Sequence, residues 1–297
     1  MTNSLYIDDK EVVVHGRFFK TARLKSEYYE WIDDPKNFVS HLKSRCAGAD
    51  LFTFLQKATE RDLQYEFRCE PDSIAALPIT TYEEWWKNQI NVKTRNMIRK
   101  AQKSGVLVRT VEFNDALIQG IKKIYDESPI RQGKPFKHYG KDLETLRESH
   151  VSYLEQSQFI GAFYGDELIG FVKLVHDDGM SHLMQIISKI RYRNMAPTNA
   201  LVDKTVEICA QKKVPYLHYG IWSSRGLGDF KKHHAFERLD LQRYFVPLNL
   251  KGTMVLFLKL YRNPTEYIPE NWLQYLADKR GQWNEFRMSR GMRTGKN

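Results

Sequence analysis

The sequence predicts an α/β protein in which a mixed, mostly antiparallel sheet is flanked by helices, with a smaller α+β domain at the N-terminal end. Two observations predict this class. Three strand-like segments follow one another at 158–164, 168–175 and 181–188, and the short turns between them are typical of antiparallel hairpins. Segments with helical periodicity come before and after these strands, so we expect helices beside the sheet.

The first 80 residues contain only short elements, and we assign 1–80 to the N-terminal α+β domain. One interpretation of this domain is a degenerate copy of the second domain. Within it 11–19 resembles a strand, 35–43 a helix and 51–55 an apolar stretch. Thr81 and Glu84 then form a capping box, which predicts a basic helix that continues to Gly105.

A second domain is predicted over 81–250, and its element order is the main structural signal. From residue 106 we read a strand, two helices, the three hairpin strands, a helix, a strand, a short helix and a strand. Asn114 or Asp115 caps the first of these helices, and Pro197 begins the helix after the hairpins. Residues 251–297 form a C-terminal extension with a basic tail.

Composition indicates a globular protein, and we expect it in the cytoplasm. Of the 297 residues 42% are hydrophobic, the start of the chain is polar, and the longest apolar run, 254–258, is too short to span a membrane. Cys46, Cys69 and Cys209 lack the spacing of a disulfide framework or a zinc site. No histidines and acidic residues lie at the spacing of a metal-binding motif such as His-Glu-x-x-His, so we predict no metal.

The net charge of +10 is unevenly distributed. Residues 85–111 carry seven bases and no acid, and 279–297 carry six bases and one acid. Such blocks suit a polyanionic partner such as a phosphorylated cofactor or tRNA, and the alternative is a solvated helix face with a frayed tail.

The hexapeptide 191–196, Arg-Tyr-Arg-Asn-Met-Ala, stands between the third hairpin strand and a helix. It resembles the Arg/Gln-x-x-Gly-x-Gly/Ala signature of GNAT acyltransferases, whose loop wraps the pyrophosphate of coenzyme A. Amides at a helix N-terminus bind phosphate, and Asn194, in place of the family's glycine, tolerates a positive φ. The resemblance implies a GNAT-type sheet and acyl-CoA as co-substrate, bound by Gln185, Ile186, Ile187, Arg191, Arg193, Asn194, Met195, Ala196 and Thr198.

A second resemblance lies at Phe230-Lys231, within a segment similar to the end of the GNAT fold. GNAT enzymes often have a tyrosine where Lys231 stands. A Phe-Lys pair looks like the Fem-type aminoacyl transferases of cell-wall synthesis, which have two GNAT-like halves and use aminoacyl-tRNA. We interpret Lys231 as a donor to the oxyanion of a tetrahedral intermediate that does not titrate in the working pH range; the alternative is a solvated lysine.

Three further candidates come from their place in this order of elements. His218 and Tyr219 lie on the strand that should diverge from 181–188, and their side chains face opposite sides of the sheet. One of them should therefore face the acceptor, while the other packs on a helix. His234 is a candidate acid or base, with a surface histidine as the alternative.

The polar loop between the first two helices of the second domain is where GNAT enzymes usually close over the acceptor. Its bases suggest an acceptor with a carboxylate or phosphate, and a plain solvated loop is the alternative. The predicted acceptor contacts are Arg131, Gln132, Lys134 and His138.

These observations predict an acyltransferase that moves an acyl group from acyl-CoA to a small-molecule or peptide amine by direct attack. Two alternatives stay open. A Fem-like aminoacyl transferase would use aminoacyl-tRNA, which Phe230-Lys231 and the basic helix favour. A non-catalytic nucleic-acid-binding protein of GNAT fold is compatible with Trp85, Trp86 and Trp283 near basic groups. The oligomeric state is not predicted.

Overall fold

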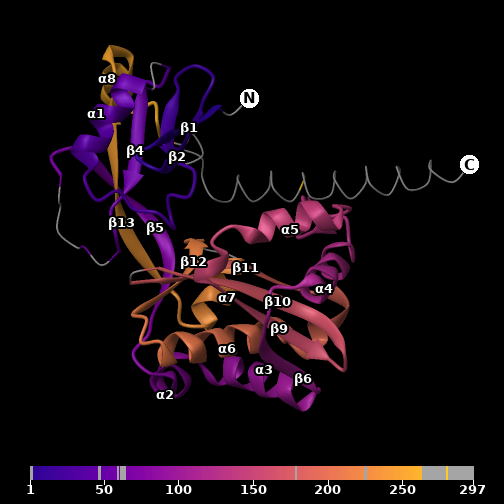
Figure 1. Ribbon diagram of the computed structural model, residues 1–297. Helices are drawn as coiled ribbons and strands as arrows, with labels where there is room; N and C mark the ends of the chain where they lie inside the picture. The colour runs from indigo at the N-terminus through magenta and orange to yellow at the C-terminus, as the bar shows by residue number, and fades with distance from the viewer. Residues whose placement is uncertain are drawn as a thin grey trace, which may run out of the picture. The chain divides into compact units, whose positions relative to one another are not determined.

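The computed structural model describes residues 3–45, 48–58, 60, 65–177, 179–223, 226–262 and 279. They belong to two compact units (Figure 1). The first unit comprises Met1–Ala76, Gly220–Gly228 and Glu237–Asn263, and the second holds Leu77–Tyr219 and Asp229–Phe236. None of the helices in these described ranges combines the length and the apolar character that a membrane span requires.

The sheet of the first unit is mostly antiparallel. Its strands in spatial order are β1 (Asn3–Ile7), β2 (Lys10–His15), β3 (Thr21–Leu24), β4 (Leu51–Leu55), β13 (Glu237–Pro247) and β5 (Arg68–Pro78). Only β3 and β4 run parallel. Helix α1 (Pro35–Arg45) packs Phe38 and Leu42 against Phe52, whereas α8 (Leu250–Phe257) packs Val255 against Leu51. Since Leu51 and Phe52 alternate along β4, the two helices cover opposite faces.

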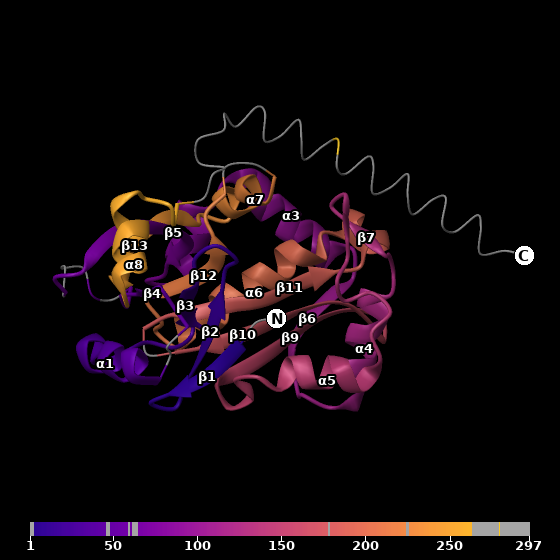
Figure 2. The same cartoon turned by 90° about the horizontal axis from the view of Figure 1, so that it is seen from above.

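The second unit has the element order that the sequence predicts from residue 106 up to the short helix, whereas the last predicted strand, β13, belongs to the first unit. Its sheet has the order β12-β11-β10-β9-β6, and Figure 2 shows β9, β10 and β11 side by side. The elements are β6 (Val106–Val111), α4 (Asp115–Tyr125), α5 (Leu143–Val151), β9 (Ser157–Tyr164), β10 (Glu167–His176), β11 (Ser181–Ser188), α6 (Pro197–Gln211), β12 (Tyr216–Ile221) and α7 (Leu227–His233).

Helices cover both faces of this sheet (Figure 1). On one face α4 and α5 pack Ile121 and Leu146 against Phe171 of β10. On the other face α6 contacts β9, β10 and β11, and α3 (Val92–Lys103) packs on α6. The apolar residues of α6 at positions 201, 202, 206, 208 and 209 are all buried, as their spacing predicts.

The predicted helix from residue 81 to 105 is broken. Thr81 caps a short turn, α2 (Tyr82–Glu84), which continues as the π-helix η1 (Trp85–Gln89). Ile90 is then extended, with φ −87° and ψ 148°, and Asn91 caps α3 by accepting the amide of Thr94 at 2.8 Å. The guanidinium of Arg95 donates to three backbone carbonyls of η1 and the break, so this base has a structural role.

The two units divide the chain differently from the domains 1–80, 81–250 and 251–297. Strand β13 pairs with β4 and β5, and α8 packs beside it, so both belong to the first unit. The predicted basic tail lies outside the described residues except for Lys279, and Cys46 and Trp283 also lie outside them.

Candidate active site

Strands β11 and β12 form a fork in the sheet of the second unit. They are paired in parallel only at Ser181 with Leu217 and at His182 with His218. Beyond His182, β11 continues for six residues, of which five pair with β10 and none pairs with β12. The predicted carrier strand at Gln185, Ile186 and Ile187 lies in this part, so its edge toward β12 carries no strand pairing. Such an edge can accept an extended ligand by β-augmentation.

The loop between β11 and α6 folds as a short 3-10 helix, η3 (Ile190–Met195). The residue with positive φ is Ala196, at 54°, and not Asn194 as the resemblance suggested. Pro197 follows directly, and a proline disfavours the right-handed helical conformation for the residue before it. Arg193 and Asn194 are exposed, whereas the hydroxyl group of Thr198 contacts that of Ser188 at 2.8 Å.

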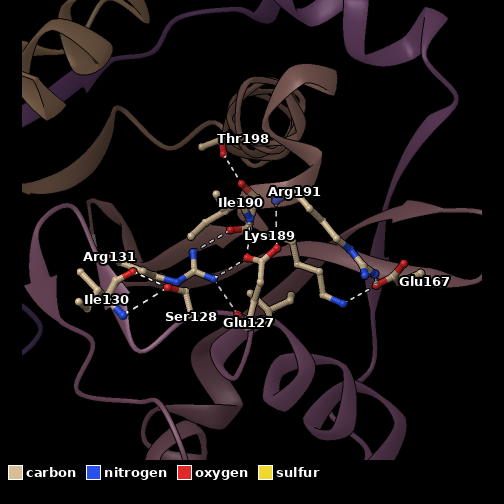
Figure 3. Close-up of polar contacts among 11 residues, drawn as sticks. Glu127, Ser128, Ile130, Arg131, Glu167, Lys189, Ile190, Arg191 and Thr198 are labelled. Atoms are coloured by element: carbon tan, nitrogen blue, oxygen red, sulfur yellow. Dashed lines mark hydrogen bonds and ion pairs between the residues drawn. The ribbon is translucent and has the colours of Figure 1, made fainter. Parts of the chain in front are cut away.

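Glu127, at the end of α4, occupies the amides of this loop (Figure 3). Its carboxylate accepts hydrogen bonds from the backbone amides of Ile190 at 2.5 Å and Arg191 at 3.0 Å. Arg131 donates to the same carboxylate at 3.2 Å. Two amides at the start of the loop are therefore bound to a carboxylate of the chain itself.

A second carboxylate, Glu167 at the start of β10, binds the bases of the loop (Figure 3). Lys189 and Arg191 both form ion pairs with Glu167, and the hydroxyl group of Tyr192 donates to it at 2.5 Å. Burial alone would raise the pKa of Glu167, but the hydrogen bonds from these residues outweigh burial and lower the pKa to about 2. Glu167 therefore stays ionised at neutral pH.

Helix α7 brings three of the four predicted catalytic residues together. Lys231 and His234 are buried, with 3% and 1% of their surface exposed, and the ammonium group of Lys231 lies 4.8 Å from the ring centre of Tyr219. The end of α7 is fixed by Trp85 and Thr94, which donate to the backbone carbonyls of His234 and His233 at 3.1 and 2.8 Å. Lys231 is therefore not the solvated lysine of the alternative interpretation.

Burial bears on the expectation that Lys231 does not titrate in the working pH range. Burial of its ammonium group lowers the pKa to about 8, which lies close to the working pH range. Burial also lowers the pKa of His234 to about 4, so this ring is neutral at pH 7. Its Nδ1 donates to the Phe230 carbonyl at 2.8 Å, and its buried Nε2 has no hydrogen-bond partner within the described chain.

The fourth predicted residue, His218, lies on the opposite face of β12 from Tyr219. Tyr219 packs against Phe236, with ring centres 5.5 Å apart, and beside Lys231. His218 contacts His182 of β11, which we did not single out from the sequence. The four candidates therefore flank the fork on both faces.

The predicted acceptor loop contains a short hairpin whose strands have two residues each, β7 (Ile130–Arg131) and β8 (Lys134–Pro135). Arg131 donates to the carbonyls of Ser188 at 2.9 Å and Ile124 at 2.7 Å, so it ties the loop to the end of β11 (Figure 3). The ring of His138 lies 4.8 Å from that of Tyr125 at a tilt of 31°, and burial lowers the pKa of His138 to about 4. Gln132 and Lys134 are exposed. Of the four predicted acceptor contacts, two thus face inward.

Among the described residues, no group of three or more His, Cys, Asp or Glu side chains is placed to hold a metal ion. Cys69 and Cys209 are free thiols, and Cys209 is buried.

No family model matches the sequence, and no curated protein is similar enough to match. Solved structures do match. The C-terminal domain of a putative lysylphosphatidylglycerol synthetase from Agrobacterium fabrum is 11% identical, with 86% of each chain covered and a TM-score of 0.56.

Two further solved structures match over similar lengths. L-PGS from Bacillus licheniformis is 12% identical, with 87% of this chain and 88% of that chain covered and a TM-score of 0.57. FemX is 9% identical, with 86% and 90% covered and a TM-score of 0.57. At these identities the likeness concerns the fold, and it confirms the predicted Fem-like, GNAT-type fold.

Proposed function

We propose that this protein is an aminoacyl transferase that moves an aminoacyl group from the ester of an aminoacyl-tRNA to an amine acceptor. The amine nitrogen attacks the ester carbonyl, a C–N bond forms, and the C–O bond to the tRNA ribose breaks. Positioning and stabilisation of the oxyanion supply most of the catalysis for such a reaction.

The observation that carries the choice of donor is the contact of Glu127 with the amides of Ile190 and Arg191. The resemblance places the pyrophosphate of coenzyme A in the loop 191–196, which begins at these amides. To bind there coenzyme A would have to displace Glu127, and it would also lie near Glu167, whose pKa is lowered to about 2. Carboxylates beside the loop repel a diphosphate, so the loop favours a carrier held elsewhere.

The basic surface of α3 supports tRNA as the carrier. Lys93, Lys100 and Lys103 are exposed and form no ion pair with any described residue, and Arg99 lies over the ring of Trp86 at 5.5 Å. Unpaired bases beside an aromatic ring are typical of surfaces that bind single-stranded nucleic acid. One matching structure is FemX, and the Fem-type proteins that Phe230-Lys231 resembles use aminoacyl-tRNA.

The burial of Lys231 favours a catalytic protein over one that only binds nucleic acid. Its ammonium group is removed from water on a helix that Trp85 and Thr94 hold in place. Burying a cation costs free energy, and a protein that only binds RNA through an exposed face of α3 does not require it. In the proposed reaction, the protonated Lys231 stabilises the negative charge of the tetrahedral intermediate.

Acyl-CoA is the second candidate donor, and one observation favours it. The edge of β11 at Gln185–Ile187 is not paired with β12, so its amides can bind the amide groups of a pantetheine arm. In the proposed aminoacyl transfer, the aminoacyl group and the terminal nucleotide of tRNA occupy this fork in place of a pantetheine arm.

The test is a transfer assay with the full chain, a mixture of aminoacyl-tRNAs carrying a radiolabelled amino acid, and a panel of amines. We expect label to move from tRNA to an amine, with Lys231→Met about 10²–10³-fold slower in turnover. Acetyl-CoA is the parallel donor. Transfer from acetyl-CoA in place of tRNA would overturn the proposal that aminoacyl-tRNA is the donor. Binding of tRNA without transfer from either donor would support the non-catalytic alternative.

A further inference from the structure

Two buried histidines and a half-buried aspartate form a connected chain at the base of the fork. The carboxylate of Asp177, in the turn between β10 and β11, lies 2.8 Å from Nε2 of His182, and Nδ1 of His182 lies 2.9 Å from Nδ1 of His218. Only 1% of the surface of His182 and 3% of that of His218 is exposed. The two rings meet edge to face, with their centres 5.1 Å apart.

With a neutral His182, the order of donors and acceptors in this chain sets both tautomers. A carboxylate only accepts, so Nε2 of His182 carries the proton and donates to Asp177. A neutral His182 then has a bare Nδ1, which must accept. His218 then carries its proton on Nδ1, donates it to His182 and has its lone pair on Nε2. An imidazolium His182 would instead donate from both nitrogens, and His218 would then carry its proton on Nε2.

The position of this lone pair matters because His218 belongs to the last paired residues of the fork. Beyond His182 and His218 the two strands are no longer paired. His182 faces α5, because it lies opposite Val175, which shares a face with Lys173, and Lys173 donates to the His150 carbonyl of α5 at 2.9 Å. Lys231 and Tyr219 lie on the other face, so the ammonium group of Lys231 and the imidazole of His218 are on opposite faces of the fork.

We propose that His218 is the general base of the transfer and that Asp177 and His182 are positioning residues that hold it in the required tautomer. This inference rests on the proposed aminoacyl transfer. As the neutral amine attacks the carbonyl, His218 Nε2 takes one amine proton. When the C–O bond breaks, the same proton passes to the departing ribose oxygen, so the products are an amide and a free tRNA hydroxyl group.

The structural part of the proposal is tested without any substrate. Nitrogen-15 NMR of the wild-type chain, with the histidine assigned by loss of its signals in His218→Gln, shows which ring nitrogens carry protons. We expect a protonated Nδ1 and a bare Nε2 at His218, and the reverse at His182. A proton on Nε2 of neutral His218 would overturn the relay, whether or not the protein transfers aminoacyl groups.

The catalytic part is tested by turnover of the donor that the wild type uses. We expect His218→Gln and Asp177→Asn to lower kcat by at least about 10²-fold, with the acceptor KM within about twofold. An asparagine can donate as well as accept, so Asp177→Asn should also give mixed tautomers at His218 by NMR. Asp166→Asn, at the exposed turn of the preceding hairpin, is the matched control and should keep wild-type turnover.

The outcomes separate the two proposals. If the wild type transfers no aminoacyl group while the tautomers are as expected, the proposed function fails and the relay stands as a structural finding. If the wild type is active and His218→Gln keeps its kcat, the general base lies elsewhere and the inference is overturned. Should a variant lose its cooperative melting transition, the wild-type spectrum still decides the tautomers.

Discussion

Glu127 and Arg191 are joined through the backbone: the carboxylate of Glu127 accepts the amide of Arg191 at 3.0 Å, 64 residues later in the chain. The same carboxylate accepts the neighbouring amide of Ile190 and the guanidinium of Arg131. An acidic side chain thus holds the loop that in GNAT enzymes binds a phosphorylated carrier. The first prediction tests whether this carboxylate excludes such a carrier.

Glu127→Ala should expose the two amides and remove a negative charge, so the loop should gain affinity for an anion. We expect the variant to bind inorganic pyrophosphate and coenzyme A more tightly than the wild type, by tenfold or more in isothermal titration. It should lose only about 1 kcal/mol of stability, because the freed amides of Ile190 and Arg191 are exposed and can donate to water. Glu155→Ala, at an exposed site, is the control. Tight binding of coenzyme A by the wild type would contradict the prediction.

The second prediction concerns the stability cost of Lys231. Its pKa is about 8 in the folded protein against an ordinary value of 10.5, so the folded state releases the proton first. Between about pH 8 and 10.5 the unfolded state holds more protons, and the free energy of unfolding should therefore rise with pH. Below pH 8 the full cost is present, on the order of 3 kcal/mol.

Lys231→Met should consequently raise Tm at pH 7 and flatten the rise of stability between pH 8 and 10.5, while it lowers turnover. Lys232→Met, next to it and exposed, should change neither. Lys173 also has a pKa lowered by burial to about 8, so part of the rise should remain. Thermal melts at several pH values measure both effects. An unchanged or lower Tm at pH 7 would show that the ammonium group is not a net cost.

A related prediction uses the same value for activity. Because the protonated Lys231 is the form that stabilises an oxyanion, kcat should fall as pH rises through about 8. Lys231→Arg keeps its charge at every accessible pH, so whatever activity it retains should not show this fall. The pH profile of kcat for the two proteins is the measurement, and the same decline in both would assign it to another group.

The third prediction separates two bases of the predicted acceptor loop. Arg131 donates to the carbonyls of Ser188 and Ile124, so Arg131→Ala should lower stability by about 1–3 kcal/mol. Lys134 is exposed, and Lys134→Ala should leave Tm unchanged but raise the KM of an anionic acceptor severalfold. Lys123→Ala, an exposed base on α4, serves as the control. A KM effect of Lys123→Ala equal to that of Lys134→Ala would indicate general electrostatics.

The local elements were predictable because their signals are local. Asn114 caps α4 by accepting the amide of Leu117 at 3.0 Å, as its position before an amphipathic segment indicates. The turn at Gly165 has a φ of 57°, which glycine adopts readily, and it separates two apolar strands. The break at Ile90 was missed, although Asn91 offered a second capping signal beside the one at Thr81.

The contacts that define the candidate site depend on register and on distant pairing, which one sequence does not provide. His182 and His218 meet only because β11 and β12 are parallel with these two residues opposite each other. Glu127 reaches Ile190 across 63 residues. Strand β13 pairs with β4, almost 190 residues earlier, so nothing near residue 240 indicates its partner. Phe230-Lys231 was found because it is a local motif.

The last prediction distinguishes the donors by salt. Binding of a nucleic acid releases counterions, so affinity falls with salt at a log–log slope of about −0.7 for each phosphate neutralised on a single strand. Lys93, Arg99 and Lys100 are exposed on α3, whereas Arg95 is held by the carbonyls of η1 and should contribute little. Neutralising the three exposed bases should therefore flatten the slope for tRNA by about two units.

The matched control neutralises Lys36, Lys43 and Arg45, three exposed bases of α1, and changes the net charge equally. Because counterion release depends on which phosphates are contacted and not on total charge, the control should keep the wild-type slope. The measurement is tRNA affinity, by fluorescence anisotropy, from low to moderate salt in all three proteins. Equal flattening in both triple variants would mean that tRNA is attracted by net charge alone. A shallow slope in the wild type would remove tRNA as the carrier and return the choice to a small donor in the fork between β11 and β12.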